Sequence, residues 1–143
     1  MNSPILAPAA MLVLWSLVVL FWMMGARLGA FKGAGVKLGE QPPGGRYQDA
    51  EAAMPDRVNW KSHNYTHLME QPTVFYAVVI VLALAGAGEG INLTLAWVYV
   101  CLRVVHSIWQ NMVNTIPVRV TLFALSSLCL LVLAVNAVRV TVF

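Results

Sequence analysis

The chain has 143 residues, of which 59% are hydrophobic and only 10% charged, and its formal net charge is +3. Soluble domains carry about 25% charged residues, so this composition excludes an ordinary soluble protein. The length corresponds to a single domain. The basic residues form no stripe with interleaved aromatic side chains, so we expect no nucleic-acid partner.

Four apolar segments account for this composition, and a helix needs about 20 apolar residues to cross a bilayer. The segments are 5–25, 72–87, 93–105 and 116–138. The two middle segments reach the required length only if their polar extensions, 59–71 and 106–111, are included. We therefore predict an all-α integral membrane four-helix bundle that forms one domain over residues 1–143. Its helices are expected at about 5–28, 59–87, 92–112 and 116–142.

The first predicted helix, 5–28, is followed by a long connection over residues 29–58 that is rich in Gly and Pro, which argues against continuous helix or strand. Six of the nine Lys and Arg residues lie in this connection or within a few residues of it, and Arg119 lies at the link between the third and fourth helices. The positive-inside rule then places both links in the cytoplasm and both termini outside. Two readings of the long connection stay open: a flexible basic connector, and a loop that contacts a ligand.

The second predicted helix carries ionisable side chains at its junction with the membrane. His63, His67 and Glu70 follow the spacing i, i+4, i+7 and therefore share one helix face. Such groups are costly in a membrane unless they are paired, hydrated or occupied by a ligand. Pro72 removes one backbone hydrogen bond, so the carbonyl near Leu68 needs water or a neighbouring donor.

The third predicted helix carries a second polar face, made by Arg103, His106 and Gln110. Arg119 opens the fourth helix at the same depth, and Arg27 closes the first. We therefore expect a cytoplasm-facing pocket with the buried carboxylate of the second helix, several imidazoles and at least two cations. Guanidinium groups bind carboxylates in a bidentate manner, and a buried carboxylate suits an ammonium group. A zwitterionic, peptide-like ligand fits both demands, and an apolar co-substrate could reach it from the lipid.

Simpler roles for the same residues stay open. Glu70 and Arg103 could pair only to hold the bundle together, since polar residues serve as interhelical contacts in membranes. His106 could be a neutral, hydrogen-bonded core residue. His63, His67 and Glu70 superficially resemble a metal site, but the sequence has no His-Glu-x-x-His signature. We therefore expect no metal.

Two motifs extend this interpretation to a known family. Arg103-Val-Val-His106 resembles the Arg-x-x-His stretch of the prostaglandin synthase branch of the membrane-associated proteins in eicosanoid and glutathione metabolism, the MAPEG family. Pro117-Val-Arg119 is similar to the Pro-Ile-Arg of that branch. The four helices and the long first cytoplasmic loop resemble the family plan over most of the chain.

The resemblance implies a homotrimer of four-helix protomers with glutathione bound between adjacent subunits. It implies that Glu70 holds the amine of glutathione and that Arg103 and His106 lie near it. His67, His63, Gln110 and Arg27 are the further candidates for glutathione binding. Arg119 matches the Arg that stabilises the thiolate and is the candidate catalytic residue. A bacterial-type member would lie in the inner membrane.

The chain departs from the family pattern at several positions. His67 stands where the eicosanoid enzymes have Asn, Gln110 where they have Tyr, and Phe123 where the prostaglandin branch has Tyr. We expect a glutathione- or thiol-dependent transferase or peroxidase that acts on small lipophilic electrophiles. The alternative is a non-enzymatic protein of the same fold that binds membrane lipids or acts as a scaffold. The sequence leaves open the identity of the electrophile or lipid, and which thiol is used.

Overall fold

A computed structural model describes residues 3–143, with the side chain of Leu38 excepted. Four long helices dominate it: α1 (Leu6–Gly33), α3 (Asp56–Leu84), α4 (Gly90–Met112) and α5 (Ile116–Val142). Three short helical segments lie between α1 and α3: η1 (Leu38–Glu40), α2 (Tyr47–Ala50) and η2 (Glu51–Ala53). All four long helices have the length and apolar composition of membrane spans. The prediction of an all-α membrane helical bundle is confirmed.

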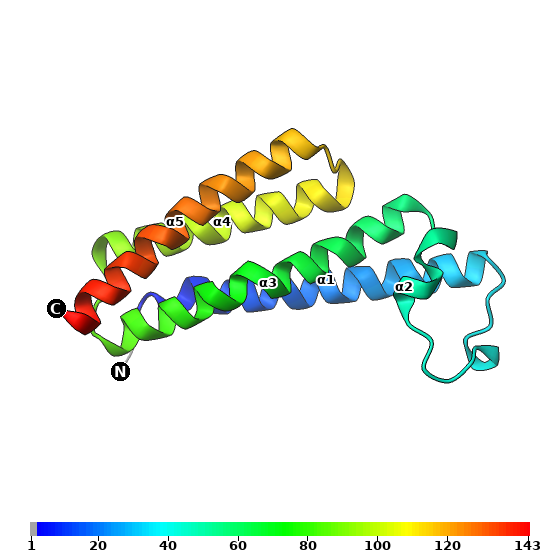
Figure 1. Cartoon of the computed structure of the whole chain (residues 1–143), viewed down its shortest axis with the longest axis horizontal. Coiled ribbons are helices and arrows are strands. Elements are labelled where there is room, and N and C mark those ends of the chain that lie inside the picture. The colour runs from blue at the N-terminus through cyan, green and yellow to red at the C-terminus, as the bar shows by residue number, and fades with distance from the viewer. Residues whose placement is uncertain (1–2) are drawn as a thin grey trace.

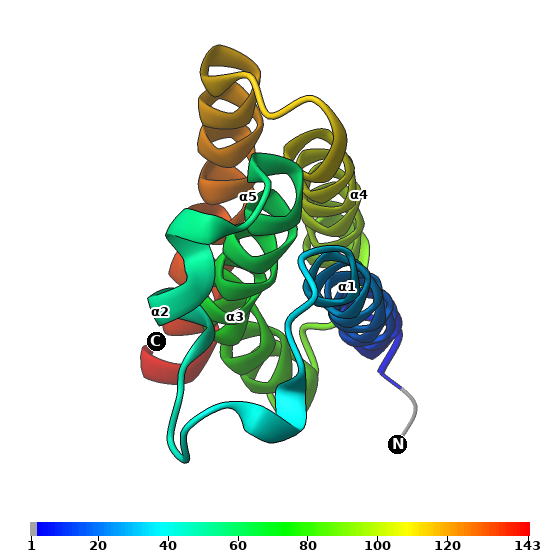
Figure 2. The same cartoon turned by 90° about the vertical axis from the view of Figure 1, so that its right-hand side faces the viewer.

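The four long helices form two pairs that lie along one another (Figure 1). α4 packs most extensively against α5, and α1 packs most extensively against α3. α1 and α5 each contact both α3 and α4 but make few contacts with each other, so they occupy opposite corners of the bundle (Figure 2). The start of α1, the end of α5 and the α3–α4 link lie at one end of the molecule, and the long connection lies at the other (Figure 1).

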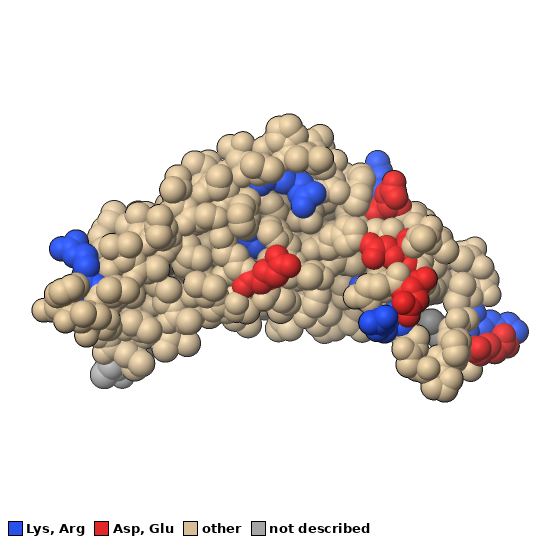
Figure 3. Space-filling view, viewed as in Figure 1, with Lys and Arg blue, Asp and Glu red and all other residues tan. Residues whose placement is uncertain are grey.

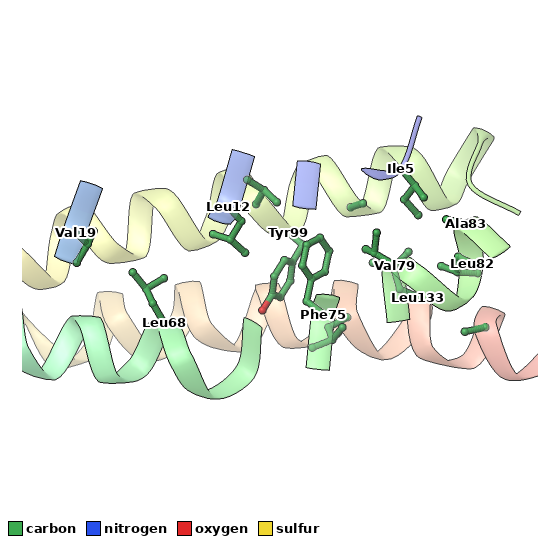
Figure 4. Close-up of a cluster of buried hydrophobic side chains, with 14 residues drawn as sticks. Ile5, Leu12, Val19, Leu68, Phe75, Val79, Leu82, Ala83, Tyr99 and Leu133 are labelled. Carbon is green, nitrogen blue, oxygen red and sulfur yellow. The ribbon is translucent and has the colours of Figure 1, made fainter. Parts of the chain in front are cut away.

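The apolar core runs along the centre of the bundle and is anchored by two aromatic rings. Phe75 of α3 and Tyr99 of α4 are fully buried, and their rings stack with centroids 4.3 Å apart. Figure 4 shows aliphatic side chains on both sides of this pair, including Leu12 and Leu68 towards one end and Val79 towards the other. This stack fixes how α3 and α4 rotate against each other, and so which side chains face one another.

The helix bounds differ from the predicted ones mainly at the long connection. α1 continues to Gly33 instead of ending near residue 28, and α3 begins at Asp56 instead of near residue 59. The connection is therefore shorter than predicted, and it contains helical turns. Glycines at the end of α1 suggested a break, but glycine inside a helix is disfavoured by only about 1 kcal/mol relative to alanine. The bounds of α5 agree with those predicted.

The long connection is fastened to the ends of α1 and α3 by polar contacts. The hydroxyl of Tyr47 donates to Oδ1 of Asn59 at 2.6 Å, and Nδ2 of Asn59 donates to the carbonyl of Glu51 at 2.9 Å. The guanidinium of Arg27 lies 3.7 Å from the ring centroid of Tyr47, a cation–π contact. These contacts give the connection a defined position over the end of the α1–α3 pair.

A sharp turn joins α4 to α5 and determines where α5 begins. Asn114 adopts a left-handed conformation with φ 61°, which Asn tolerates better than most residues. The backbone N–H groups of Val113 and Asn114 both donate to the carbonyl of Trp109, which ends α4. Pro117 then occupies the first turn of α5, where its missing N–H is harmless. The turn thereby places the first residues of α5 beside the end of α4.

Candidate functional site

His67 lies at the centre of a polar cluster where α3, α4 and α5 meet. Its Nδ1 atom is 3.1 Å from Oε2 of Glu70, one turn along α3. Its ring contacts that of His106 of α4, with centroids 5.1 Å apart, and that of Phe123 of α5, with centroids 5.3 Å apart. Its backbone carbonyl accepts a hydrogen bond of 2.9 Å from Nη2 of Arg103. One residue therefore links all three helices.

The guanidinium of Arg103 is the most unusual group in this cluster. The residue has 0% exposure, and its Nε and Nη1 atoms bind no partner among residues 3–143. Its charged carbon lies 5.9 Å from the ring centroid of Phe123. Burial of an unpaired charge is strongly unfavourable, so two nitrogens without a partner on such a cation favour a site for an anionic ligand.

The same guanidinium binds the backbone beside the defect expected at Pro72. α3 continues through Pro72, whose missing N–H leaves the carbonyl of Leu68 without its helical donor. Arg103 donates to the carbonyl of His67, one residue earlier. This donor from α4 therefore reaches the neighbouring carbonyl and not that of Leu68.

Glu70 corrects one expectation from the sequence. The predicted pocket contained a buried carboxylate, but the side chain of Glu70 is 62% exposed within the protomer. It makes no salt bridge with Arg103 in the described part of the chain; its ionic partner there is His67. The reason is geometric, because Glu70 lies on the flank of α3 that no other helix covers, whereas Arg103 points into the bundle.

Arg119 approaches the cluster from the first turn of α5. Its Nη1 donates to Oδ1 of Asn114 at 2.8 Å, and its buried Nε binds nothing within residues 3–143. Phe123 follows Arg119 by one helical turn and carries the ring that contacts His67. Arg119 is therefore held by the α4–α5 turn on the same side of α5 as the cluster.

Two of the predicted site residues lie elsewhere. Nε of Arg27 donates to Ser62 at 3.0 Å, on the side of α3 that faces α1. His63 forms an ion pair with Glu51 of the long connection. Both residues therefore hold the connection in place, and the structure does not bring them to His67. Both residues lie at the predicted cytoplasmic ends of their helices, which was compatible with a shared pocket. The place where the long connection folds against these helix ends could not be predicted from the sequence.

The structure adds polar residues that the sequence reasoning missed. Nε2 of Gln71 donates to Ser127 of α5 at 2.7 Å, and the hydroxyl of Tyr99 donates to Oε1 of Gln71 at 3.3 Å. Gln71 lies one turn after His67, and Tyr99 one turn before Arg103. This i, i+4 spacing places Gln71 on the same helix face as His67, and Tyr99 on the same face as Arg103, so it could have identified both residues. These bonds join α3, α4 and α5 one helical turn away from the cluster, on its side towards the stacked rings of Phe75 and Tyr99.

A second group of buried amides lies nearer the α4–α5 turn. Nδ2 of Asn64 donates to Ser107 at 2.7 Å. Gln110, a predicted ligand residue, is 2% exposed, and its Oε1 has no partner in the described chain; the same holds for both amide atoms of Asn111. Unpaired buried amides of this kind bind water or the polar groups of a ligand.

Figure 3 shows how these charges are distributed on the surface. Acidic and basic side chains gather at the end with the long connection, and a smaller group lies on the otherwise uncharged middle of the same face. Within residues 3–143, no three His, Cys, Asp or Glu side chains are grouped to hold a metal ion.

The opposite side of the bundle is apolar. A cavity of about 380 Å³ lies between α1 and α4 and is lined by hydrophobic side chains, among them Trp15, Val100 and Val104. Because α1 and α5 occupy opposite corners, this cavity and the polar cluster lie on different faces of the protomer. A hydrocarbon group fits such a lining.

Comparison with known proteins gives one result that bears on this site. A family model described as the MAPEG family matches residues 5–139. That range contains every residue of the polar cluster. The curated proteins and the solved structures yield no match.

Proposed function

Because the chain belongs to the MAPEG family, whose members are membrane glutathione-dependent transferases and peroxidases, we propose that it is a glutathione- or thiol-dependent transferase or peroxidase. Its substrates are small lipophilic electrophiles that arrive from the bilayer. The chain is an integral membrane protein with four candidate spans. Its location in a bacterial inner membrane, with both termini outside, is part of the same proposal.

The observation that carries this proposal is the buried, unpaired guanidinium of Arg103. Two nitrogens without a hydrogen-bond partner at 0% exposure leave N–H donors for a carboxylate, and glutathione has two carboxylates. Glu70, which is accessible and negative, suits the glutathione amine. Gln110, with its unpaired amide oxygen, suits a peptide N–H of the ligand.

Arg119 is the residue that we assign to the chemical step. A guanidinium close to the thiol stabilises the thiolate, which is the nucleophilic form. Its Nε is unoccupied, and the Asn114 contact fixes the direction of the side chain. The thiolate then attacks an electrophile or reduces a hydroperoxide.

Proteins of this family are typically trimeric, and the exposed position of Glu70 supports a homotrimer here. A carboxylate on the uncovered flank of a spanning helix requires a polar neighbour or a ligand beside it. An adjacent subunit that covers the α3–α5 face supplies that environment and closes the site.

Calorimetric titration of glutathione into the detergent-purified protein tests the function. We expect binding that both Glu70→Gln and Arg119→Ala weaken. The absence of binding to the parent protein would remove the thiol-dependent function.

The second candidate is a lipid-binding protein without thiol chemistry, and the apolar cavity between α1 and α4 favours it. Phe123, which carries no hydroxyl, is consistent with this function. It predicts lipid that co-purifies with the protein and no response to glutathione. Mass spectrometry of the extracted protein, with and without prior exchange into lipid-free detergent, distinguishes the two candidates.

A further inference from the structure

We propose that His67 and Glu70 form a general-base pair in which Nε2 of His67 removes the proton from the bound thiol. The inference rests on the proposed function and adds a proton acceptor to it. Arg119 then stabilises the thiolate, and His67 generates it. Three features of His67 support this role: the tautomer of its ring, the fixed orientation of the ring and its access to a ligand.

The contact with Glu70 determines the tautomer. A carboxylate only accepts hydrogen bonds, so Nδ1 of His67, at 3.1 Å from Oε2, must be the protonated nitrogen. This leaves the lone pair of a neutral imidazole on Nε2, which binds no side chain among residues 3–143. An imidazole with one nitrogen on a carboxylate and the other free has the arrangement of a general base.

The ring is held by contacts from three helices. The rings of His106 and Phe123 both lie within 5.3 Å of it, centroid to centroid, and the Arg103 bond to its carbonyl holds its backbone. His67 and Glu70 are an i, i+3 pair, and such a pair on the surface of an isolated helix would lack these contacts from neighbouring helices. The orientation of a base has to be restricted before its substrate binds, and these contacts restrict it.

The ring also remains accessible. The side chain of His67 is 23% exposed, whereas His106 is 2% exposed and therefore lies deeper. The charged and titratable groups that face the ring are Glu70 on its own helix, Arg103 and His106 on α4, and Arg119 on α5. His67 is thus the imidazole that a thiol in this site can reach.

The proposed step is a proton transfer followed by a substitution. The S–H bond of glutathione breaks with its electron pair left on sulfur, and the proton forms a new N–H bond at Nε2 of His67. The carboxylate of Glu70 offsets the imidazolium charge. With an aryl chloride as electrophile, sulfur bonds to the carbon that carries chlorine, and chloride leaves with the electron pair of the C–Cl bond. The proton then passes from His67 to water, which restores the base.

Full-length protein in detergent allows a direct test with glutathione and a dinitro-substituted aryl chloride. The parent rate should rise with pH as His67 becomes neutral and then reach a plateau. His67→Asn should lower the rate at neutral pH by about 100-fold, the usual effect of losing a general base, and should abolish this rise. The rate that remains should increase only at higher pH, where the thiol ionises by itself. His63→Asn, which removes the histidine paired with Glu51, should retain the pH profile of the parent.

Two further measurements separate a base from a positioning role. Free imidazole should restore part of the rate to His67→Ala, because it can occupy the vacated space and accept the proton. The ultraviolet absorbance of the bound thiolate should form at higher pH in His67→Asn than in the parent.

The outcomes distinguish this inference from the function on which it rests. If the parent binds glutathione, and His67→Asn forms thiolate at the same pH without any rescue of His67→Ala, the general-base role is wrong and the thiol-dependent function stands. If the parent binds no glutathione, both are overturned. A displaced thiolate midpoint together with imidazole rescue supports the pair.

Discussion

Nη2 of Arg103 donates to the backbone carbonyl of His67 at 2.9 Å, so a buried cation on α4 holds the central residue of the site on α3. Its Nε and Nη1 atoms have no hydrogen-bond partner among residues 3–143. It therefore stabilises local structure with one N–H group and leaves the others for a ligand. The structural role of this guanidinium and its proposed role in ligand binding can therefore be tested separately.

Arg103→Met is expected to abolish glutathione binding without lowering the thermal stability of the ligand-free protein. Replacing a buried charge by an apolar side chain of similar length is often neutral or stabilising, which offsets the lost bond to His67. Thermal unfolding with and without glutathione measures both effects, because only a binding protein gains stability from ligand. Arg103→Lys, which keeps the charge without the fork, is the matched comparison. A large fall in Tm without ligand would show that Arg103 is mainly structural.

Arg119→Ala should lower turnover by about 100-fold, since removal of one group that stabilises developing charge has an effect of that size. The oligomeric state on size-exclusion chromatography should be unchanged. Arg139 lies exposed in the last turn of α5, so Arg139→Ala is the control and should retain turnover. Unchanged turnover in Arg119→Ala would remove its proposed role.

Asn114 allows its backbone role to be separated from its side-chain role. Asn114→Ala should destabilise the protein by about 1–2 kcal/mol, because alanine is strained at a φ of 61°. Asn114→Gly removes the same bond to Arg119 but accepts this conformation, so stability should be retained while turnover falls. Denaturant titration and turnover assays on the two variants give this comparison. Equal stability of the two variants would contradict the conformational argument.

Tyr47→Ala should release the long connection from the ends of α1 and α3. The substitution removes the bond to Asn59 and the ring beneath Arg27. We expect faster tryptic cleavage after Lys37 and Arg46, monitored by mass spectrometry. Gln48→Ala changes an exposed neighbour whose side chain binds nothing in the described chain, and it should be cleaved at the parent rate.

Phe75→Ala should be the most destabilising of these substitutions. Truncation of a fully buried Phe lowers the free energy of unfolding by about 3–5 kcal/mol, through lost transfer energy and the cavity that is left. Phe21→Ala is the matched control, since Phe21 is 67% exposed on α1. Denaturant titration in micelles measures both. A similar loss for the two variants would show that the Phe75–Tyr99 stack contributes little.

The fold could be predicted from the sequence because the length of an apolar run and its flanking charges depend on one helix at a time. The start of α5 was predictable for the same reason, since Pro117 favours a first helical turn. The end of α1 was not, because its last turn, at Phe31, packs edge-on against Tyr47 of the connection. That contact joins residues whose approach no local pattern describes.

Only part of the candidate site could be predicted from the sequence. Helical spacing places His67 with Glu70 and Arg103 with His106, because each pair lies on one helix. The contacts between helices depend on how α3, α4 and α5 rotate about their axes, which the packing of buried rings decides. For this reason the bonds of Gln71 were missed, and the carboxylate of Glu70 was expected to be buried.

Glu70 lies 14 residues into α3, about 21 Å along the helix at 1.5 Å per residue, and its side chain is 62% exposed within the protomer. A newly inserted chain would therefore expose a carboxylate to lipid until a neighbour or ligand shields it, at a cost of a few kcal/mol or more. Solitary copies in the bilayer are disfavoured for that reason alone. Both a higher concentration of the protein in its membrane and a higher concentration of the ligand would then shift the equilibrium from copies with an exposed Glu70 to copies in which it is shielded.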